Sequence, residues 1–370
     1  MDSSCFFCTT PFQIISAILL TSEIGIDSDL YIVPQFKTAS ELASAIASEK
    51  IFRNVCVVDT DKFEGYKRSR TKLGLYWGII RNYIEVDGIV DDFLLENRDY
   101  KHLYISSKAN VGRLVSLYYY KKKRLPQIHY IDDGESSYDN KKIIEASKAD
   151  RVIRLLVFGV GVNEISEVDR YLFSPELYSL INPDSTARIF PMPEITNKVK
   201  ELILRVFDIS KENLVTEPVL IVDILKSENM VGSESEKLIW LYKDIIEQFG
   251  KENVVIKKHP RDRATDLDIA KYYTDYSIPL EALCIASDFQ YKILISAGST
   301  AIVLPKILFG AEPIVILLNK LVTTKQYEIS KAEQYYEMCR SIYSDKTRFI
   351  IPNSIEEFRE IIQGLSEEFL

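Results

Sequence analysis

Short apolar runs rich in β-branched residues alternate with helical patterns along most of the chain, and this alternation limits the fold more than any other feature. Strands that are connected by helices form parallel sheets, and the helices cover both faces of the sheet. The sequence therefore predicts an α/β protein. The apolar runs lie at residues 5–8, 29–33, 54–59, 102–107, 127–133, 218–225, 253–260, 291–300 and 313–318.

The alternation loosens once, between about Glu164 and Glu217. The stretch "FSPELYSLINPDSTARIFPMPEIT" in this region carries four of the 13 prolines and indicates a domain connection. A chain of 370 residues is also too long for one ordinary core. We predict two Rossmann-like αβα domains facing a central cleft: residues 1–170, a connection over 171–216, and residues 217–370. Ligands of such sheets bind beyond the carboxyl ends of the strands.

Net charge, apolar runs and cysteine content limit which partners and which cell compartment suit this protein. The net charge is −8 and the pI is about 5.3, which argues against nucleic acid as a partner because phosphate neutralisation needs a basic excess. No apolar stretch reaches the roughly 18 residues of a membrane span, and the N-terminus lacks a basic leader segment. Five scattered cysteines suit a reducing compartment. We expect a cytoplasmic protein without a metal site, since no second Cys/His pair follows Cys5 and Cys8 at zinc spacing.

Two segments, residues 67–81 and 117–124, mix basic and aromatic side chains. Such segments can rest on an anionic membrane surface, but solvated helix faces are the preferred explanation. A single long helix is expected from Lys72 to about Leu95. The sequence is compatible with peripheral contact at the cytoplasmic membrane face and with a homodimer.

The stretch "YIDDG" places two acids at the end of a predicted strand. Asp132 and Asp133 follow the apolar run, and Gly134 allows a sharp exit. Alternation along the strand points the two carboxylates to different sides. One of them can then face a cleft as a general base while the other bonds to backbone. A turn with a helix cap accounts for the same residues equally well.

A second candidate is "IKKHPRDR", where His259 ends a strand and Pro260 fixes the following turn. Histidine can hydrogen-bond a phosphate and give it a proton. A solvated basic turn is the alternative. The basic residues around this histidine are Lys257, Lys258, Arg261 and Arg263.

A third candidate is "SAGST" at residues 296–300, where Ser299 and Thr300 precede a predicted helix. Free N–H groups at a helix start bind phosphate, although ordinary N-capping explains the same residues. The spacing of a P-loop is absent. Asp59 and Asp61 form an acidic triplet of the kind that holds a divalent ion in many sugar transferases, but a turn is the preferred interpretation.

The order of these motifs resembles that of the bacterial sialyltransferases, in which they are described as D/E-D/E-G, H-P and S-S/S-T. Here they are "DDG" at 132–134, "HP" at 259–260 and "ST" at 299–300. The opening "CTTPFQI" also resembles that of glycosyltransferase family 52, which includes lipooligosaccharide and capsule sialyltransferases of about this length. The resemblance is spread along the chain from Thr9 to Thr300.

The resemblance implies a GT-B fold, with a glycan acceptor bound by the first domain and CMP-sialic acid by the second. It implies inverting, metal-independent transfer with no cofactor beyond the donor substrate. It implies that His259 contacts the departing phosphate of CMP and that Ser299 and Thr300 hold the same phosphate. It also implies that Glu281, in "SIPLEALC", binds the ribose of the nucleotide. The other expected substrate-binding residues are Thr10, Gln13, Asp133, Gly134, Pro260, Arg261, Ser296 and Gly298.

The general base has two candidates. The sister families imply the first acid of the acidic turn, Asp132, which we prefer. Family 52 implies an acid after the first strand of the second domain, which here is Glu228, although "ILKSE" lacks the Gln and Pro of some relatives. Other interpretations keep the fold and change the donor to a UDP-sugar or a CDP-polyol, or make the chain a non-catalytic sugar-nucleotide-binding protein.

Overall fold

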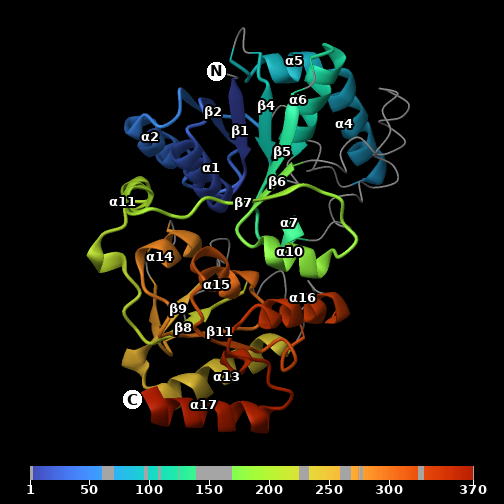
Figure 1. Cartoon of the computed structure of the whole chain (residues 1–370). Coiled ribbons are helices and arrows are strands. Elements are labelled where there is room, and N and C mark those ends of the chain that lie inside the picture. The colour runs from blue at the N-terminus through green and yellow to red at the C-terminus, as the bar shows by residue number, and fades with distance from the viewer. Residues whose placement is uncertain are drawn as a thin grey trace. The chain divides into compact units, whose positions relative to one another are not determined.

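The computed structural model divides the chain into two compact units, Met1–Phe207 and Asp208–Leu370 (Figure 1). It describes residues 3–60, 71–95, 99–106, 110–124, 126–138, 169–224, 233–258, 268–273, 275, 278–323 and 329–369. Each unit has a parallel sheet with helices in the connections, so the α/β class expected from the alternation is confirmed.

Unit 1 contains a seven-stranded parallel sheet in the order β3-β2-β1-β4-β5-β6-β7. The order reverses between β1 and β4, and this is where doubly wound sheets bind ligands. The strands are β1 (Ser4–Cys8), β2 (Ser28–Ile32), β3 (Asn54–Val57), β4 (His102–Ile105), β5 (Gln127–Ile131), β6 (Asp169–Leu172) and β7 (Ile189–Pro191).

Crossover connections between parallel strands are right-handed as a rule, so connections that run in opposite directions from the reversal are expected to place helices on both faces of this sheet. On one face, apolar side chains of α5 and α6 pack on Phe7, Leu103 and Ile105. Helix α11 contacts α1 and α2. The described helices are α1 (Pro11–Ile24), α2 (Ala39–Glu49), α4 (Lys72–Ile84), α5 (Val86–Asp91), α6 (Asn110–Lys121), α7 (Glu135–Tyr138), α10 (Pro175–Ile181) and α11 (Asn197–Val206).

Local sequence explains why α1 begins and ends where it does. Thr10 caps its N-terminus by accepting from the Gln13 N–H, Pro11 occupies the first turn, and Gly25 ends it in the left-handed region at φ 73°. These local signals therefore set both ends of α1.

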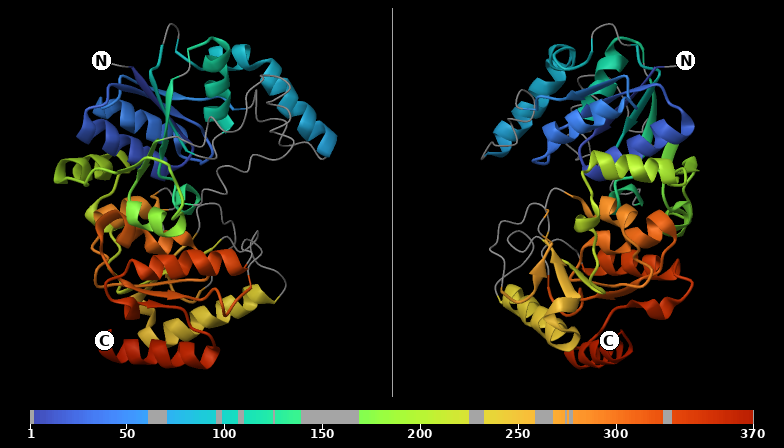
Figure 2. Two further views of the ribbon diagram at one scale, coloured as in Figure 1. Left: turned by 45° about the vertical axis from the view of Figure 1, so that its right-hand side comes forward. Right: turned by 90° about the vertical axis from the view of Figure 1, so that its left-hand side faces the viewer.

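The single helix expected from Lys72 to about Leu95 is two helices. Glu85 stands between α4 and α5 with φ −89° and ψ 11°, outside the α-helical range, and its N–H still bonds to the Arg81 carbonyl. Figure 2 shows α4 extending outward from the rest of unit 1.

The expected connection over residues 171–216 also differs from the structure. Strands β6 and β7 extend the first sheet here, and the unit boundary falls after Phe207. Polar residues made β6 difficult to recognise as a strand. Asp169 is buried because the side chains of Gln127 and Arg188 donate to its carboxylate.

Unit 2 contains a six-stranded parallel sheet in the order β10-β9-β8-β11-β12-β13, which repeats the strand order of the first six strands of unit 1. The strands are β8 (Val219–Val222), β9 (Val254–Lys257), β10 (Lys271–Tyr272), β11 (Ile293–Ser296), β12 (Ile314–Leu317) and β13 (Phe349–Ile350). The described α-helices of this unit are α13 (Glu234–Phe249), α14 (Leu280–Ala286), α15 (Leu304–Phe309), α16 (Ile329–Ser341) and α17 (Ile355–Phe369). The short 3₁₀ helices are η3 (Lys211–Asn213), η4 (Lys251–Asn253), η5 (Thr300–Val303) and η6 (Lys346–Arg348).

Candidate active site

The acidic turn joins β5 to α7 at the carboxyl edge of the first sheet. Gly134 has φ +76°, a conformation that other L-residues rarely adopt, and a Cβ there would meet nothing within 4 Å. The chain can therefore leave the strand sharply, as the sequence indicated, and carry both aspartates at the strand end.

Asp132 is the buried member of the pair. Its side chain is 0% exposed and accepts from the Tyr138 hydroxyl (2.6 Å), the Gly134 N–H (2.8 Å) and the Phe173 N–H (3.1 Å). Burial raises its pKa from 3.8 to about 6, and these hydrogen bonds oppose that rise because they stabilise the ionised form. The carboxylate is enclosed by protein donors, which contradicts the expectation that Asp132 is the member that faces a substrate.

Asp133 is the partly exposed member. Its Oδ1 accepts from the Gln13 side-chain amide (2.6 Å) and the Thr10 hydroxyl (3.3 Å), and its N–H donates to the Ser137 hydroxyl (2.7 Å). Both side-chain donors come from the start of α1, where Thr10 is the N-cap and Gln13 lies in the first turn. The geometry therefore favours Asp133 over Asp132 as an acid that meets a substrate. Its Oδ2 also accepts a long hydrogen bond from the Ser136 hydroxyl (3.4 Å), so the carboxylate is oriented from α1 and from α7.

Gln13 is fully buried, so it does not contact a substrate directly as the sequence led us to expect. Its Oε1 accepts from the Thr9 N–H (2.6 Å) and hydroxyl (3.2 Å), while its amide donates to Asp133. This one side chain links the turn after β1 to the acidic turn after β5. Its role in the described geometry is to orient the carboxylate.

In unit 2 the small-residue turn follows β11, next to the strand-order reversal between β8 and β11. Ser296 is fully buried, donates to the Val222 carbonyl (2.7 Å) and accepts from the N–H groups of Gly298 (3.3 Å) and Ser299 (3.0 Å). It shapes the turn and is enclosed, contrary to its expected place among substrate-binding residues. Gly298, Ser299 and Thr300 are partly exposed.

Ordinary capping does not explain Ser299. It precedes η5, and its side chain makes no capping hydrogen bond. The hydroxyls of Ser299 and Thr300 remain candidates for holding an anion at the carboxyl edge of the second sheet.

The sequence did not single out Asp223, which directly follows β8 on the other side of the reversal. Its side chain is buried, and Oδ1 accepts from the Tyr242 hydroxyl (2.8 Å) and the Ile224 N–H (3.0 Å). The signal was present in "PVLIVDIL", where an acid ends a buried run. The other acid proposed for this strand end, Glu228, lies outside the described residues.

The basic turn after β9 is described only up to Lys258, so His259, Pro260 and Arg261 lie outside the described residues. Both lysines before it are buried. Lys257 donates to the Ile278 carbonyl (2.8 Å), and burial lowers its pKa to about 8, against the effect of the acids Glu281 and Asp275.

The ammonium group of Lys257 is therefore hydrogen-bonded to the backbone just before α14. Glu281, the residue expected to hold the ribose, lies in the first turn of that helix and is partly exposed.

The described part of the chain bears on metal ligation and on membrane crossing. There, no group of three or more His, Cys, Asp and Glu side chains is arranged to hold a metal ion. Asp59 is described, whereas Asp61 lies outside the described residues. No described helix combines the length and the apolar character needed to cross a membrane.

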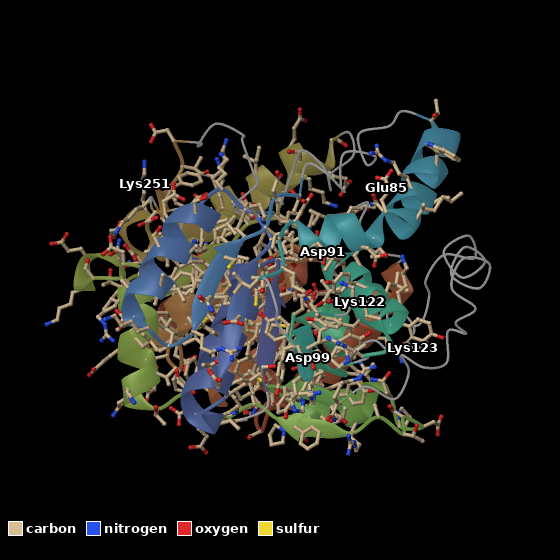
Figure 3. All side chains as sticks on the ribbon, turned by 90° about the horizontal axis from the view of Figure 1, so that it is seen from above. Glu85, Asp91, Asp99, Lys122, Lys123 and Lys251 are labelled. Carbon is tan, nitrogen blue, oxygen red and sulfur yellow. The ribbon has the colours of Figure 1, made fainter. Side chains whose placement is uncertain are left out.

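Two of the basic residues at the end of α6 are paired with acids on α5. Lys121 bonds to Asp87 (2.5 Å). Lys122 lies 3.5 Å from Asp91, and Figure 3 labels both of these residues. Trp77 on the neighbouring α4 is 68% exposed. The surface of α5 and α6 thus mixes both signs of charge, as a solvated helix face does, and contact with a membrane stays a prediction.

The comparisons with known proteins identify the family and the fold. The model for glycosyltransferase family 52 matches residues 79–308, which is more than half of the chain. No curated protein matches the chain at the level of sequence. The similarity expected from the three motifs is therefore confirmed by the family match.

Two solved structures show the same fold. One is LpCGTa in complex with UDP, at TM-score 0.52 and 10% identity over 99% of this chain and 90% of that chain. The other is UGT2 of Phytolacca americana with UDP-2-fluoro-glucose and pterostilbene, at TM-score 0.53 and 8% identity over 100% of this chain and 91% of that chain. The chain is a glycosyltransferase with the GT-B fold and belongs to glycosyltransferase family 52.

Proposed function

We propose that this enzyme transfers sialic acid from CMP-sialic acid to a glycan acceptor of the capsule or lipooligosaccharide type, with inversion and without a metal ion. Family membership and the ordered sialyltransferase-like motifs support this donor. The observation that carries the proposal is Asp133, a partly exposed carboxylate oriented by Gln13 and Thr10 at the carboxyl edge of the first sheet. An oriented acid at this edge suits activation of a sugar hydroxyl.

In the proposed reaction the acceptor hydroxyl attacks the anomeric carbon of sialic acid while the bond from that carbon to the phosphate oxygen breaks. Asp133 takes the hydroxyl proton, and CMP leaves with the bonding electron pair. General base help of this kind is worth roughly 10²–10⁴ in rate. We assign this role to Asp133 in place of Asp132, because Asp132 is enclosed by three protein donors.

The remaining roles rest on the family resemblance. His259 would offset charge on the departing phosphate, Ser299 and Thr300 would hold the same phosphate, and Glu281 would bind the ribose. The absence of a capping bond from the Ser299 side chain supports its part in this assignment. Preorganised donors of this kind stabilise charge as it develops on the leaving group.

A second candidate donor is a UDP-sugar. The two structures with the same fold contain UDP or a UDP-glucose analogue, and their identity of 10% or less transfers the fold alone. A CDP-polyol donor and non-catalytic binding of a sugar nucleotide are the further alternatives.

One experiment separates these functions. The full chain is incubated with CMP-sialic acid, UDP-glucose or CDP-glycerol, with and without a labelled glycan acceptor of the capsule or lipooligosaccharide type. Donor binding and the released nucleotide are both measured. We expect CMP release from CMP-sialic acid, accelerated by the acceptor. Release of UDP or turnover of CDP-glycerol with CMP-sialic acid untouched would replace the proposed donor. Saturable binding without turnover of any donor would favour a binding protein.

A further inference from the structure

Arg170 in β6 is a buried cation that the proposed reaction does not use. The residue is 2% exposed, and no carboxylate among the described residues pairs with it. Its guanidinium lies 5.5 Å from the Tyr130 ring and 5.3 Å from the Tyr178 ring, and its Nε has no hydrogen-bond partner among the described residues. Burying such a charge is costly, and the burial lowers its pKa. Because the desolvation of this guanidinium is unfavourable, we looked to its contacts for a role that offsets it.

The guanidinium meets the backbone of α7, the short helix that follows the acidic turn. Nη1 of Arg170 donates to the Ser137 carbonyl at 3.5 Å, a long hydrogen bond. The side-chain amide of Asn182, just after α10, donates to the next carbonyl, that of Tyr138, at 2.6 Å. Two side chains from the β6–α10 segment therefore contact consecutive carbonyls of α7.

Helix α7 in turn holds Asp133. The Ser137 hydroxyl accepts the Asp133 N–H at 2.7 Å, so Ser137 is contacted by Arg170 through its carbonyl and by Asp133 through its side chain. The same β6–α10 segment supplies the Phe173 N–H to Asp132. The backbone of the acidic turn is thus fixed from a segment about forty residues away in sequence, as the separations of these hydrogen bonds show.

We propose that Arg170 and Asn182 are positioning residues that hold α7 so that the Asp133 carboxylate keeps its reactive orientation. This inference rests on the proposed function, in which Asp133 is the base. Small displacements of a catalytic group cost rate steeply, by as much as about 10²-fold for about 1 Å. Loss of either side chain should therefore lower transfer through Asp133, while the nucleotide site assigned to the other unit is unaffected.

The test is a double-mutant cycle in the full chain. Transfer kcat is measured for wild type, Arg170→Met, Asn182→Ala, Asp133→Asn and the two doubles that include Asp133→Asn, together with the CMP dissociation constant and the melting temperature of each. We expect each single positioning variant to lose about 10-fold or more in kcat with an unchanged CMP dissociation constant. In the Asp133→Asn background the same changes should cost little further, because residues that act through one group are not additive.

Two further variants sharpen the cycle. Arg170→Lys keeps the cation and should recover part of the lost kcat. Arg205→Met makes the same substitution at an exposed arginine of α11 that bonds to Glu49, and it should leave kcat unchanged. If Arg170→Met does not fold, Asn182→Ala completes the cycle alone.

The outcomes distinguish a failure of the positioning role from a failure of the proposed function. Losses of equal size with and without Asp133 would overturn the positioning role and make both side chains general supports of unit 1. Near-wild-type transfer by Asp133→Asn would remove the base assignment and this inference with it. A wild-type chain that releases no CMP from CMP-sialic acid would instead overturn the proposed function, on which the inference rests.

Discussion

At the scale of single residues, two adjacent carboxylates on one turn are placed in different surroundings. Asp132 receives three donors and is enclosed. Asp133 is partly exposed, with Oδ1 bonded to Gln13 and Thr10 and Oδ2 bonded to the Ser136 hydroxyl at 3.4 Å. The difference arises because successive residues of an extended chain point to opposite sides. The Asp132 side chain meets the β6–α10 segment, and the Asp133 side chain meets the start of α1.

The first prediction compares these two acids. Asp133→Asn should lower transfer by about two orders of magnitude or more, because the amide cannot accept the proton. It should leave CMP binding intact. Asp132→Asn should mainly lower stability, by about 1–3 kcal/mol, since one of the enclosing donors would face an NH₂ group. Transfer rates, CMP affinity and melting temperatures of both variants test this. A severe loss of transfer with unchanged stability in Asp132→Asn would restore it as the base.

The second prediction concerns pH. Because the pKa of Asp132 is raised in the folded state to about 6, the folded protein binds this proton more tightly than the unfolded chain does. The stability that it adds is fully present below about pH 4 and is lost as the pH rises through 6. One pKa unit corresponds to about 1.4 kcal/mol, so the loss is about 3 kcal/mol.

Urea unfolding of the wild type and Asp132→Asn at pH 4.5 and pH 7 checks this prediction. The stability of the wild type relative to the variant should fall between the two values, since carboxylates common to both proteins cancel in the difference. A relative stability that stays constant or rises with pH would show that this carboxyl is ionised throughout the range.

At the scale of elements, the acidic turn depends on its glycine. Gly134→Ala should destabilise the protein by about 1–2 kcal/mol, because its φ of +76° is unfavourable for a residue with a Cβ even though the space is open. Gly88→Ala in α5 is the matched control: a Cβ there also meets nothing within 4 Å, and helix propensity predicts a gain of up to about 1 kcal/mol. Chemical unfolding of both variants would decide. Equal effects would mean that the turn tolerates alanine.

Within each turn, buried polar side chains stabilise the backbone, while neighbouring side chains are left partly exposed. Residues that the motifs marked as substrate-binding, Gln13 and Ser296, are buried and hold turns together. Their neighbours Asp133 and Ser299 are partly exposed. A turn that presents a reactive group needs its backbone hydrogen bonds satisfied from within, and a buried polar side chain beside it meets that need.

At the scale of the whole molecule, His259→Ala should leave the fold intact and lower kcat strongly. The proposed reaction uses this side chain to offset charge on the departing phosphate, and its sequence position, at a strand end among basic residues, motivates the assignment. The measurement is CMP release together with a melting curve. Near-normal turnover in a folded variant would remove His259 from the mechanism.

The last prediction concerns metal dependence. We expect turnover of CMP-sialic acid to continue in EDTA, because the proposed chemistry offsets the charge of the leaving phosphate with protein groups. The control is the same assay with added Mg²⁺ or Mn²⁺. Activity lost on chelation and restored by either ion would direct attention to Asp59 and Asp61 and would argue against the sialyltransferase assignment.

The sequence alone determined the class, the two-unit organisation and the family. Apolar runs such as "CFFC" and "VLIV" are buried whatever their neighbours, so their alternation with helices is readable locally. The motifs after β5, β9 and β11 were readable for the same reason, because they are short and lie at strand ends. Strand β6 was missed because "DRYL" begins with two charged residues. Their burial makes sense only once Gln127 and Arg188 meet Asp169, and the tyrosine rings meet Arg170.

Which aspartate faces outward was decided by the tertiary structure. Sequence alternation says that Asp132 and Asp133 point to different sides, but it does not say which side will be covered. The covering segment, β6 and α10, joins the sheet from about forty residues further along and brings the Phe173 N–H to Asp132. Gln13 reaches Asp133 from 120 residues away. Burial of a carboxylate depends on such distant donors, and local pattern carries no information about them.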